Sequence, residues 1–502
     1  MPDRPVTTVP GLAALLPDHP ADPRTPVLHR LTDAATLGEL TAAVDDLAGR
    51  LVSLGVSGRE PVACVVEDAL TAVLAMFAVW RVGGVYIPVN ARLADAELHE
   101  HLAAADPLLV VVDEEQAPRV PGDRTRLIRS PDGRWNSSPG TPWAGERFAP
   151  GTALIMRTSG TTGPAKPVVL RHAGILEGVD TVIARLRGGS RGGGGSPPPN
   201  LIPASLALWA GIWNVLFAFR VGAPVILLER FDPVHCAELI RRHGIRSTVL
   251  APAMMTMLVE DPRVTDLAPL KLVRSITAPL TPAQARRFRE RFGVGVLNSY
   301  GQTELGGEVV GWTAADLREF GDAKLGSPGR PHPGITLRVL DEEHAQVPPG
   351  EPGEIWIHSP FATRQDGDRV DGEGFLRTGD LGRVDADGFL WIEGRVSDMI
   401  NRGGFKIVPQ EVEDALRGHP DVADACVAGV PDPRLGEVPV AWVRPAAGAA
   451  PDEAALREFA RGALAGYKVP VAIHLVPDFP RNEIGKVLRR ELVAGYERTN
   501  AQ

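Results

Sequence analysis

The residues with the clearest chemical potential lie in a loop that follows an apolar run about a third of the way along the chain. The apolar segment 153–156 passes into a stretch of hydroxyls, glycines and one lysine, which are Thr158, Ser159, Gly160, Thr161, Thr162, Gly163 and Lys166. Glycines let backbone N–H groups converge on an anion, hydroxyls add donors, and the lysine adds a positive charge. The pattern predicts a strand that ends in a phosphate-binding loop.

This stretch is not a Walker A loop, because Pro167 follows Lys166 where that motif has serine or threonine. An ordinary surface turn rich in Ser, Thr and Gly is the alternative interpretation. The rest of the sequence favours phosphate binding, since four more motifs follow in order. They are NSYGQTE at 298–304, RTGDLG at 377–382, GRVSD at 394–398 and NEIGK at 482–486.

Together the five motifs resemble those of the adenylate-forming superfamily, which includes acyl-CoA synthetases, peptide-synthetase adenylation domains and beetle luciferases. Each motif is short, but five in one order over nearly the whole chain are highly specific. The chain is similar to the acyl-CoA synthetase branch. This resemblance implies an α/β fold with a large multi-subdomain N-terminal portion of strand–helix–strand sheets, and a small mobile α+β C-terminal domain.

The resemblance also implies a division of labour between the domains. Residues 1–394 are expected to bind the acyl group and the nucleotide, 395–397 to form a hinge, and 398–502 to form the small mobile domain. Ser397 stands at the pivot, where the family commonly has aspartate or lysine. Serine can also absorb a backbone rotation, so we expect the small domain to move during the reaction.

Several residues match the family's nucleotide contacts. Tyr300 offers a flat face for adenine, and Asp380 and Arg395 match residues that hydrogen-bond the ribose hydroxyls. An aspartate in such a turn is alternatively a cap. The remaining expected nucleotide contacts, besides the phosphate loop, are Thr277, Ala278 and Pro279 in the adenine-binding turn, and Ser299, Gly301, Gln302 and Thr303.

Three residues are assigned to catalysis by the same resemblance. Glu304 matches the family's magnesium ligand, and a carboxylate suits a hard cation that bridges phosphates. Lys486 matches the lysine that bridges the carboxylate and phosphate oxygens, and Thr158 begins the phosphate loop. The alternatives are that Glu304 is a solvated surface charge and that Lys486 is a surface lysine before a basic helix.

Two further sites follow from the resemblance. The acyl pocket is expected to include Leu206, Trp209, Trp213, Leu305 and Gly306, and the pantetheine tunnel for CoA to include Gly403, Gly404, Phe405 and Lys406. The segment 203–214 is alternatively an ordinary core helix. It contains no aspartate of the kind that holds a substrate ammonium in peptide synthetases, so an amino-acid substrate is disfavoured.

These residues suit a two-step activation of a carboxylic acid. Transfer of AMP from ATP to the carboxylate creates an anhydride from which AMP leaves readily. Two anions must meet in that step, so catalysis consists mainly of positioning and charge stabilisation, here by Mg²⁺, the phosphate loop and Lys486. The thiol of CoA, or of an acyl carrier protein, then displaces AMP. We therefore expect an acyl-CoA ligase that acts on an apolar carboxylic acid without an amino group, such as an acid from secondary metabolism.

The phosphate loop departs from the family pattern. Ala165 and Pro167 stand where proline and glycine are usual, and Asn482 replaces a common threonine. Proline lacks an N–H donor, so the presentation of the triphosphate can differ. One alternative is therefore that only thioesterification from a supplied acyl-AMP persists. The others are loading of an acyl carrier protein and non-catalytic binding of acyl or nucleotide ligands.

The elements that must position these motifs can be predicted from periodicity. Apolar residues at helical spacing predict a helix over 37–54, and the patterns predict strands over 61–66, 85–88 and 108–112 with a helix over 70–80 between the first two. This alternation is typical of a parallel sheet whose ligands lie at the carboxyl ends of strands. In the small domain we expect helices beginning at 411 and over 456–464, and strands at 427–430 and after 470.

Composition sets outer limits on function. The chain has 502 residues, enough for at least two domains, and a formal net charge of −9, which disfavours a nucleic-acid binder. Three cysteines without metal spacing, no signal-like N-terminus and no apolar run of membrane length indicate a cytoplasmic enzyme without a membrane span.

Overall fold

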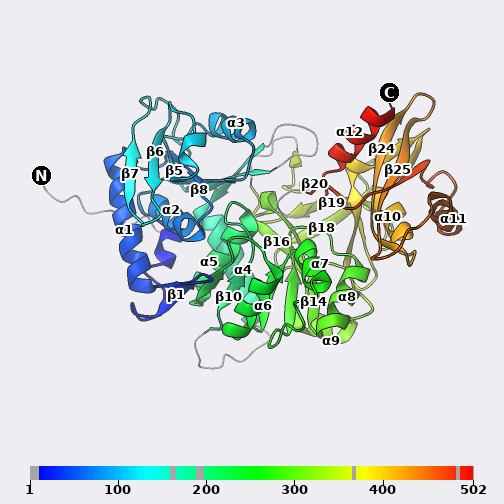
Figure 1. Cartoon of the computed structure of the whole chain (residues 1–502), viewed down its shortest axis with the longest axis horizontal. Coiled ribbons are helices and arrows are strands. Elements are labelled where there is room, and N and C mark those ends of the chain that lie inside the picture. The colour runs from blue at the N-terminus through cyan, green and yellow to red at the C-terminus, as the bar shows by residue number, and fades with distance from the viewer. Residues whose placement is uncertain (1–10, 159–165, 188–196, 364–368, 482–486, 501–502) are drawn as a thin grey trace, which may run out of the picture.

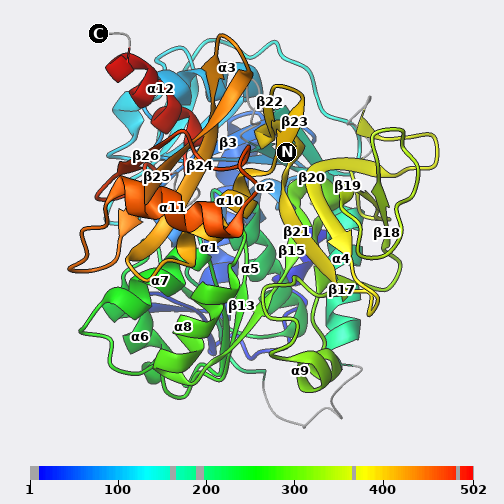
Figure 2. The ribbon, with the colours of Figure 1, turned by 90° about the vertical axis from the view of Figure 1, so that its right-hand side faces the viewer.

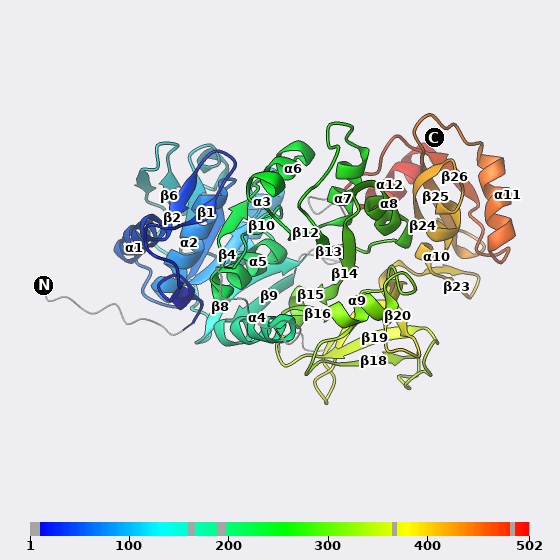
Figure 3. The ribbon, with the colours of Figure 1, turned by 90° about the horizontal axis from the view of Figure 1, so that it is seen from below.

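The structure is a computed structural model of the chain, and it describes residues 11–158, 166–187, 197–363, 369–481 and 487–500. The N-terminal elements and the small C-terminal domain lie at opposite ends of an elongated molecule (Figure 1, Figure 3). The architecture is mixed α/β, as the sequence predicts. Within the described residues, no helix is long and apolar enough to cross a membrane.

The first sheet has seven strands in the order β7-β6-β5-β3-β4-β8-β9. Five strands pair in parallel, and β7 and β9 pair antiparallel at the two edges. The strands are β3 (Pro61–Val65), β4 (Val85–Val89), β5 (Leu109–Asp113), β6 (Thr125–Arg129), β7 (Trp135–Ser138), β8 (Thr152–Thr158) and β9 (Lys166–Arg171). All residues of β3 and β4 are buried, as expected for central strands covered on both faces.

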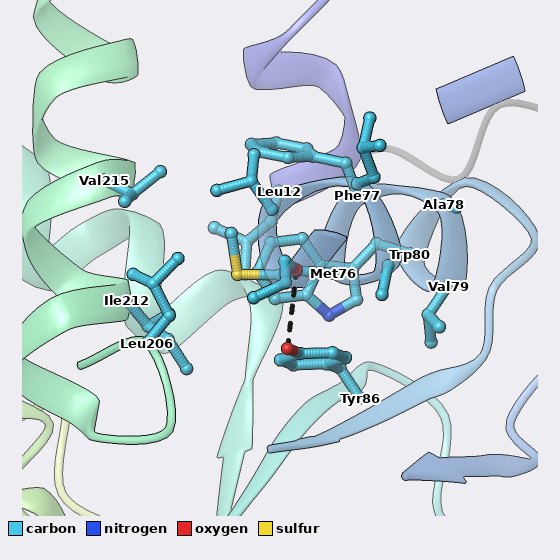
Figure 4. Packing of buried hydrophobic residues seen from close by; sticks show 14 of the residues in the cluster. Leu12, Met76, Phe77, Ala78, Val79, Trp80, Tyr86, Leu206, Ile212 and Val215 are labelled. Atoms are coloured by element: carbon cyan, nitrogen blue, oxygen red, sulfur yellow. Dashed lines mark hydrogen bonds between the residues drawn. The ribbon is translucent and has the colours of Figure 1, made fainter. Parts of the chain in front are cut away.

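Helices cover this sheet and confirm the alternation predicted from periodicity. They are α1 (Leu37–Ser53), α2 (Ala69–Arg81) and α3 (Asp95–Ala105), with short 3-10 turns η1 (Leu12–Leu15) and η2 (Ala117–Arg119). Thr36 caps α1 by accepting from the backbone N–H of Glu39, and Gly55 follows the helix with a φ of 101°. Figure 4 shows Trp80 and Tyr86 packed against residues of α2 and α5 in the largest core.

A second sheet has the order β10-β11-β1-β2. Its elements are β1 (Pro26–His29), β2 (Ala34–Thr36), β10 (Asn200–Ile202) and β11 (Val225–Leu227), with α4 (His172–Arg187) and α5 (Trp209–Val221) beside it. The sequence predicts a helix from residue 203, whereas α5 begins at Trp209. Ser205 forms a turn instead, since its hydroxyl accepts from the N–H of Ala207 and its carbonyl from the N–H of Leu208.

A third sheet leads directly to the nucleotide motifs. Its strands β12 (Ser247–Leu250), β13 (Leu272–Ser275) and β14 (Gly295–Asn298) are parallel and pack with α6 (Pro233–Arg242), α7 (Pro252–Glu260) and α8 (Pro282–Phe292). The carboxyl ends of β13 and β14 open into segments 276–279 and 299–304. Ligands of open α/β sheets bind at such ends, so this sheet positions the adenine-binding motifs.

Antiparallel strands complete the N-terminal portion. A three-stranded sheet contains β15 (Tyr300–Gln302), β16 (Gly307–Gly311) and β17 (Arg330–Pro331), with η3 (Thr303–Leu305) and α9 (Ala314–Phe320) nearby. A four-stranded sheet contains β18 (Thr336–Leu340), β19 (Gly353–His358), β20 (Leu376–Val384) and β21 (Leu390–Arg395). The β20–β21 pairing places Asp380 opposite Arg395, so two sequence-distant motifs meet.

The small domain follows the short turn η5 (Val396–Asp398). It contains β22 (Ile400–Arg402), β23 (Phe405–Ile407), β24 (Val422–Asp432), β25 (Gly436–Pro445) and β26 (Ala472–Leu475), with α10 (Pro409–Arg417), α11 (Glu453–Ala463) and α12 (Arg489–Asn500). The helices and strands predicted for this domain are present. The strand predicted at 427–430 is longer than expected, because it is part of β24. Figure 2 shows α11 on the viewer's side of this domain.

His172, the first residue of α4, gives the fold a testable pH dependence. Its Nδ1 accepts from the N–H of Leu12 at 3.3 Å, and burial lowers its pKa from 6.5 to about 4. The unfolded chain therefore binds a proton between these values and the folded chain does not. The contribution of neutral His172 to the free energy of unfolding is therefore fully present above pH 6.5. The free energy of unfolding falls by up to about 3 kcal/mol as the pH drops towards 4.

His172→Gln keeps an acceptor for Leu12 but cannot titrate. We expect its unfolding free energy to fall less between pH 6.5 and pH 4 than that of the wild type, by up to about 3 kcal/mol. Urea unfolding at a series of pH values measures the difference. Parallel pH profiles for the two proteins would contradict the assignment.

Candidate active site

The largest described cleft lies between the N-terminal portion and the small domain and has a volume of about 1360 Å³. On one side it is lined by the ends of β13 and β14, by segments 298–304 and 377–380, and by β21. On the other side it is lined by α10, by residues 424–426 and by the segment before α12. The nucleotide motifs therefore converge on one space even though they lie far apart in the sequence.

Asp380 is the centre of a hydrogen-bond network in this cleft. One carboxylate oxygen accepts from the Tyr300 hydroxyl at 2.6 Å and from the Gln302 amide at 2.7 Å. The other lies 3.0 Å from Nε of Arg395. The side chain of Asp380 is only 7% exposed. A carboxylate has about four acceptor positions, so one remains available for a ribose hydroxyl.

Tyr300 is held as a neutral hydrogen-bond donor. Burial, and then the neighbouring Asp380 carboxylate, raise the pKa of its phenol well above the usual 10. The hydroxyl is therefore committed to Asp380 at every pH at which the protein works. The sequence predicts a stacking face for adenine at Tyr300 and a ribose contact at Asp380; the structure places both residues on the cleft and joins them by a hydrogen bond.

Gly301 serves the neighbouring strand. A side-chain carbon at this position would lie 2.0 Å from the carbonyl oxygen of Gly307, because β15 and β16 approach closely there. Only glycine permits this pairing. The sequence predicts a nucleotide contact at Gly301, and the glycine lines the cleft while also allowing the strand contact.

The adenine-binding turn contains a strained residue. Thr277 has a φ of 72°, which is unusual for a β-branched side chain, and it lines the cleft with Ala278 and Pro279. The left-handed conformation costs roughly 1–2 kcal/mol for a residue with a Cβ. Strain of this kind clusters at ligand-binding sites, where surrounding structure maintains it.

Thr277→Gly should therefore raise the unfolding free energy by about 1 kcal/mol, since relief of strain exceeds the entropic cost of glycine. Ala278→Gly, at a neighbour without positive φ, should lower it by roughly 0.5–1 kcal/mol. Thermal and urea unfolding compare the two variants. A destabilised Thr277→Gly would show that the threonine side chain outweighs the strain.

Glu304 lies in η3 and faces the cleft with a side chain that is 12% exposed. Its carboxylate lies 3.9 Å from Arg369, and its carbonyl accepts from the N–H of Thr363 at 2.8 Å. Within the described residues there is no cluster of three metal-ligating side chains. One carboxylate nevertheless fits Mg²⁺, which usually takes one or two protein carboxylates and completes its shell with phosphates and water.

The tip of the phosphate loop, 159–165, and Lys486 lie outside the described residues, so the predictions for Ser159, Gly160, Thr161, Thr162, Gly163 and Lys486 stay predictions. The base of the loop is a hairpin in which Thr158 pairs with Lys166. Met156, Arg157 and Val168 of this hairpin line the cleft. Arg481 and Val487, which flank 482–486, also line it, so both ends of the Lys486 segment lie at the cleft.

The expected acyl-pocket residues divide into two groups. Trp209 and Trp213 line the cleft. Leu206 lies instead in the main core and borders a separate cavity of about 30 Å³ with Tyr86 (Figure 4). Leu305 is fully buried under the β18–β21 sheet, and a side chain at Gly306 would meet Phe361. The cleft lining includes none of these last three residues.

The expected CoA loop lies outside the cleft lining in this arrangement. Gly403 and Gly404 form the turn between β22 and β23. Phe405 is 58% exposed and stacks on Tyr467 at 4.7 Å, and Lys406 forms an ion pair with Glu342 of the N-terminal portion. A tunnel formed by this loop therefore requires a different orientation of the small domain.

Sequence reasoning missed an ion-pair network that frames the Lys486 segment. Arg489 contacts Glu413 at 2.7 Å and Asp398 at 3.4 Å, while Arg481 contacts Asp424 at 3.1 Å. Burial lowers the pKa of the Arg489 guanidinium, but the negative groups around it, Glu413 first among them, together outweigh burial, so the pKa is raised. Asp398 adjoins Ser397, which is exposed on the cleft, so the network links the segment to the expected hinge. The only sequence signal was the pair of arginines after Lys486.

A second missed group lies near the tryptophans. Glu308 accepts from Arg274 at 3.1 Å and contacts His332 at 3.0 Å. All three are separated in sequence and belong to no motif, so only the fold brings them together. Arg274 and Glu308 line the cleft, which gives the acyl end of the site a balanced charge.

Comparison with known proteins places the chain in a family context. Residues 19–365 match the family described as AMP-binding enzyme, and residues 411–486 match the AMP-binding enzyme C-terminal domain. A sulfoacetate–CoA ligase from Cupriavidus necator is 32% identical over 92% of this chain and 91% of its own length. An indoleacetate–CoA ligase from Aromatoleum aromaticum is 31% identical over 91% and 92%.

Solved structures resemble the whole fold. ATP-bound MatB from Rhodopseudomonas palustris has a TM-score of 0.85 at 28% identity, covering 97% of this chain and 99% of that one. The apo form of the same protein has a TM-score of 0.73 at the same coverage. The fold of this chain therefore superposes more closely on the ATP-bound form than on the apo form.

Proposed function

Since the chain belongs to the AMP-binding enzyme family and is a ligase of its acyl-CoA synthetase branch, we propose that it activates an apolar, non-amino carboxylic acid with ATP and transfers the acyl group to CoA. A carboxylate oxygen attacks the α-phosphorus of ATP, and diphosphate leaves. The CoA sulfur then attacks the acyl carbon, loses its proton, and AMP leaves. Both steps use the cleft between the two domains.

The observation that carries this proposal is the network around Asp380. A buried carboxylate that is held by three donors and keeps one acceptor position free suits a ribose hydroxyl. Arg395, 38% exposed, reaches Asp380 from β21 at the edge of the expected hinge. The network thus ties nucleotide binding to the boundary between the domains.

Glu304 is the residue that would hold Mg²⁺, which supplies charge neutralisation on the phosphates when bound. Arg157, at the base of the phosphate loop, adds positive charge on the cleft wall. Lys486 is proposed to neutralise negative charge where the substrate carboxylate approaches the phosphates of ATP. Its withdrawal, by rotation of the small domain about Ser397, would admit the thiol through the Gly403–Lys406 hairpin.

The experiment is a panel of carboxylic acids incubated with CoA and either ATP or preformed acyl-adenylates, with thioesters recorded by mass. We expect thioester from both sources, with AMP and diphosphate released from ATP. Thioester from adenylates alone would show that the altered phosphate loop has lost adenylation. A parallel incubation contains an acyl carrier protein in place of CoA. Transfer of the acyl group only to that protein would show that the carrier protein, and not CoA, is the thiol acceptor.

We also propose that the enzyme works in the cytoplasm. The three cysteines are free thiols buried in the fold, and burial raises the pKa of each to about 12. Such thiols persist in a reducing compartment, and the cytoplasm also supplies ATP and CoA.

A further inference from the structure

Trp209 and Trp213 place two indole rings on one face of α5. They lie one helical turn apart, so their side chains project to the same side. Both line the cleft together with Thr303, Glu304 and Gly307. Trp213 also stacks on Phe217 at 5.3 Å, which fixes the plane of its ring.

The indole nitrogens converge on one point beside Gly307. A carbon placed where that glycine lacks a side chain would lie 3.3 Å from Nε1 of Trp213 and 3.5 Å from Nε1 of Trp209. Gly307 has a φ of 133° and belongs to the bulged pairing of β15 with β16. A single ligand atom near this point is therefore within reach of both N–H donors.

The donor on Trp209 lacks a partner. Trp209 is 8% exposed, and its Nε1 is buried without a hydrogen-bond partner among the described residues. Buried indole N–H groups normally find an acceptor, so an unsatisfied one beside a large cleft calls for a ligand. Met156, Val168 and Ala210 are among the apolar residues that line the same cleft.

The charge around this point indicates which acceptor fits. The Glu308 carboxylate follows Gly307 directly, but its oxygens are engaged by Arg274 and His332. Because Arg274 already pairs with that carboxylate, its charge is not available to neutralise a second anion, whereas a neutral oxygen needs no counter-charge. Two neutral donors converging on one point suit a carbonyl, hydroxyl or ether oxygen.

We propose that Trp209 and Trp213 form a donor pair that binds a neutral oxygen on the acyl portion of the substrate. The inference rests on the proposed function and narrows its substrate class. The acid is apolar over most of its length and carries one oxygen acceptor beyond the carboxylate. Trp209 and Trp213 are then specificity-determining residues, and the pair rejects the deoxy analogue because its donors would stay unpaired.

The test uses matched acids that differ by one oxygen, such as 4-hydroxyphenylacetic and phenylacetic acid, 4-methoxyphenylpropanoic and phenylpropanoic acid, and 5-oxohexanoic and hexanoic acid. Wild type, Trp209→Phe and Trp213→Phe are compared by kcat/KM for thioester formation. For the pair that fits best, we expect the wild type to prefer the oxygen-bearing acid by roughly 10–100-fold. Trp209→Phe should remove most of this preference, because kcat/KM for the oxygen-bearing acid falls much more than kcat/KM for its deoxy analogue.

The outcomes separate this inference from the proposal beneath it. Thioesters formed without preference for oxygen in any pair would overturn the donor pair and leave the ligase assignment intact. The same holds if Trp209→Phe lowers both members of a pair equally. The wild-type preference needs no variant, so a Trp209→Phe protein that misfolds does not remove the test. Thioester from no acid, with either ATP or adenylates, would contradict the proposed function itself.

Discussion

Lys486→Ala is expected to lower the rate of adenylation by roughly 10²–10³-fold, while thioester formation from a supplied acyl-adenylate stays near the wild-type rate. The reason is that the first step brings a carboxylate to a polyphosphate, so it depends on a positioned cation. The second step expels AMP and requires that cation to leave. The two half-reactions should therefore respond differently to one substitution.

The described structure supports this placement through the residues around the segment. Arg481 and Val487 lie on the cleft, and Arg481 and Arg489 are fixed to carboxylates of the small domain. The residues that flank 482–486 are thus held at the cleft wall. This is the arrangement expected for the first half-reaction.

Diphosphate exchange into ATP measures the first step, and mass detection of acyl-CoA from synthetic acyl-adenylate measures the second. Arg490→Ala is the matched control, since it removes one positive charge from an exposed position four residues along the chain. It should leave both rates within about twofold, as expected for a solvated charge. Equal losses in both half-reactions of Lys486→Ala would show a structural effect and contradict a role confined to adenylation.

Asp380→Ala should abolish the same exchange reaction almost completely, with a loss of roughly 10²–10³-fold, and should also destabilise the protein by about 3 kcal/mol. The substitution leaves the Tyr300 hydroxyl, the Gln302 amide and the Arg395 guanidinium without their shared acceptor. All three residues line the nucleotide cleft, so the substitution should distort the cleft and weaken its affinity for the nucleotide. Isothermal titration with AMP and urea unfolding report the two effects separately.

Asp385→Ala is the control for that experiment. Asp385 directly follows β20, the strand that contains Asp380, and it is 14% exposed. It pairs with Lys324 at 2.7 Å and Trp391 at 2.9 Å, but it does not line the cleft. Its loss should cost comparable stability and leave AMP binding near the wild-type value. If Asp385→Ala weakened AMP binding as much as Asp380→Ala, the effect would belong to the sheet as a whole and not to the ribose contact.

The small domain must break identifiable contacts to rotate. Arg444 contacts Glu260 at 3.3 Å across the domain boundary, and Lys406 pairs with Glu342. Both pairs involve partly exposed side chains, for which each contact contributes at most about 1 kcal/mol. The contacts can therefore hold the small domain in the observed orientation. They are weak enough to break, so the hairpin at Gly403 and Gly404 can reach the cleft in a different orientation of the domain.

Periodicity was sufficient for the elements that are buried on both sides or amphipathic. The predicted strands at 61–66 and 85–88 and the predicted helix over 37–54 have few competing structures, and the structure shows each within one residue of its predicted bounds. The start of α5 could not be placed, because the Ser205 turn competes locally with an otherwise helical pattern. Motif order located Asp380, Tyr300 and Glu304 on one cleft without any knowledge of the sheets.

The acyl end of the site was less predictable for a physical reason. Leu206 and Leu305 are apolar residues next to motifs, and the sequence does not show whether such a residue faces a cavity or a core. Arg274, Glu308 and His332 come from three elements and meet only through β-sheet pairing. The position of the Gly403–Lys406 hairpin depends on domain rotation, which no local pattern specifies.

The most direct test follows the label of α-³²P-ATP in a reaction with a matched acid, first without CoA and then after CoA is added. The account predicts that labelled acyl-AMP forms with an equal amount of diphosphate, stays bound, and converts to labelled AMP and unlabelled acyl-CoA on addition of the thiol. Labelled ADP, or a bound acyl-AMP that CoA fails to consume, would contradict two successive reactions in one cleft.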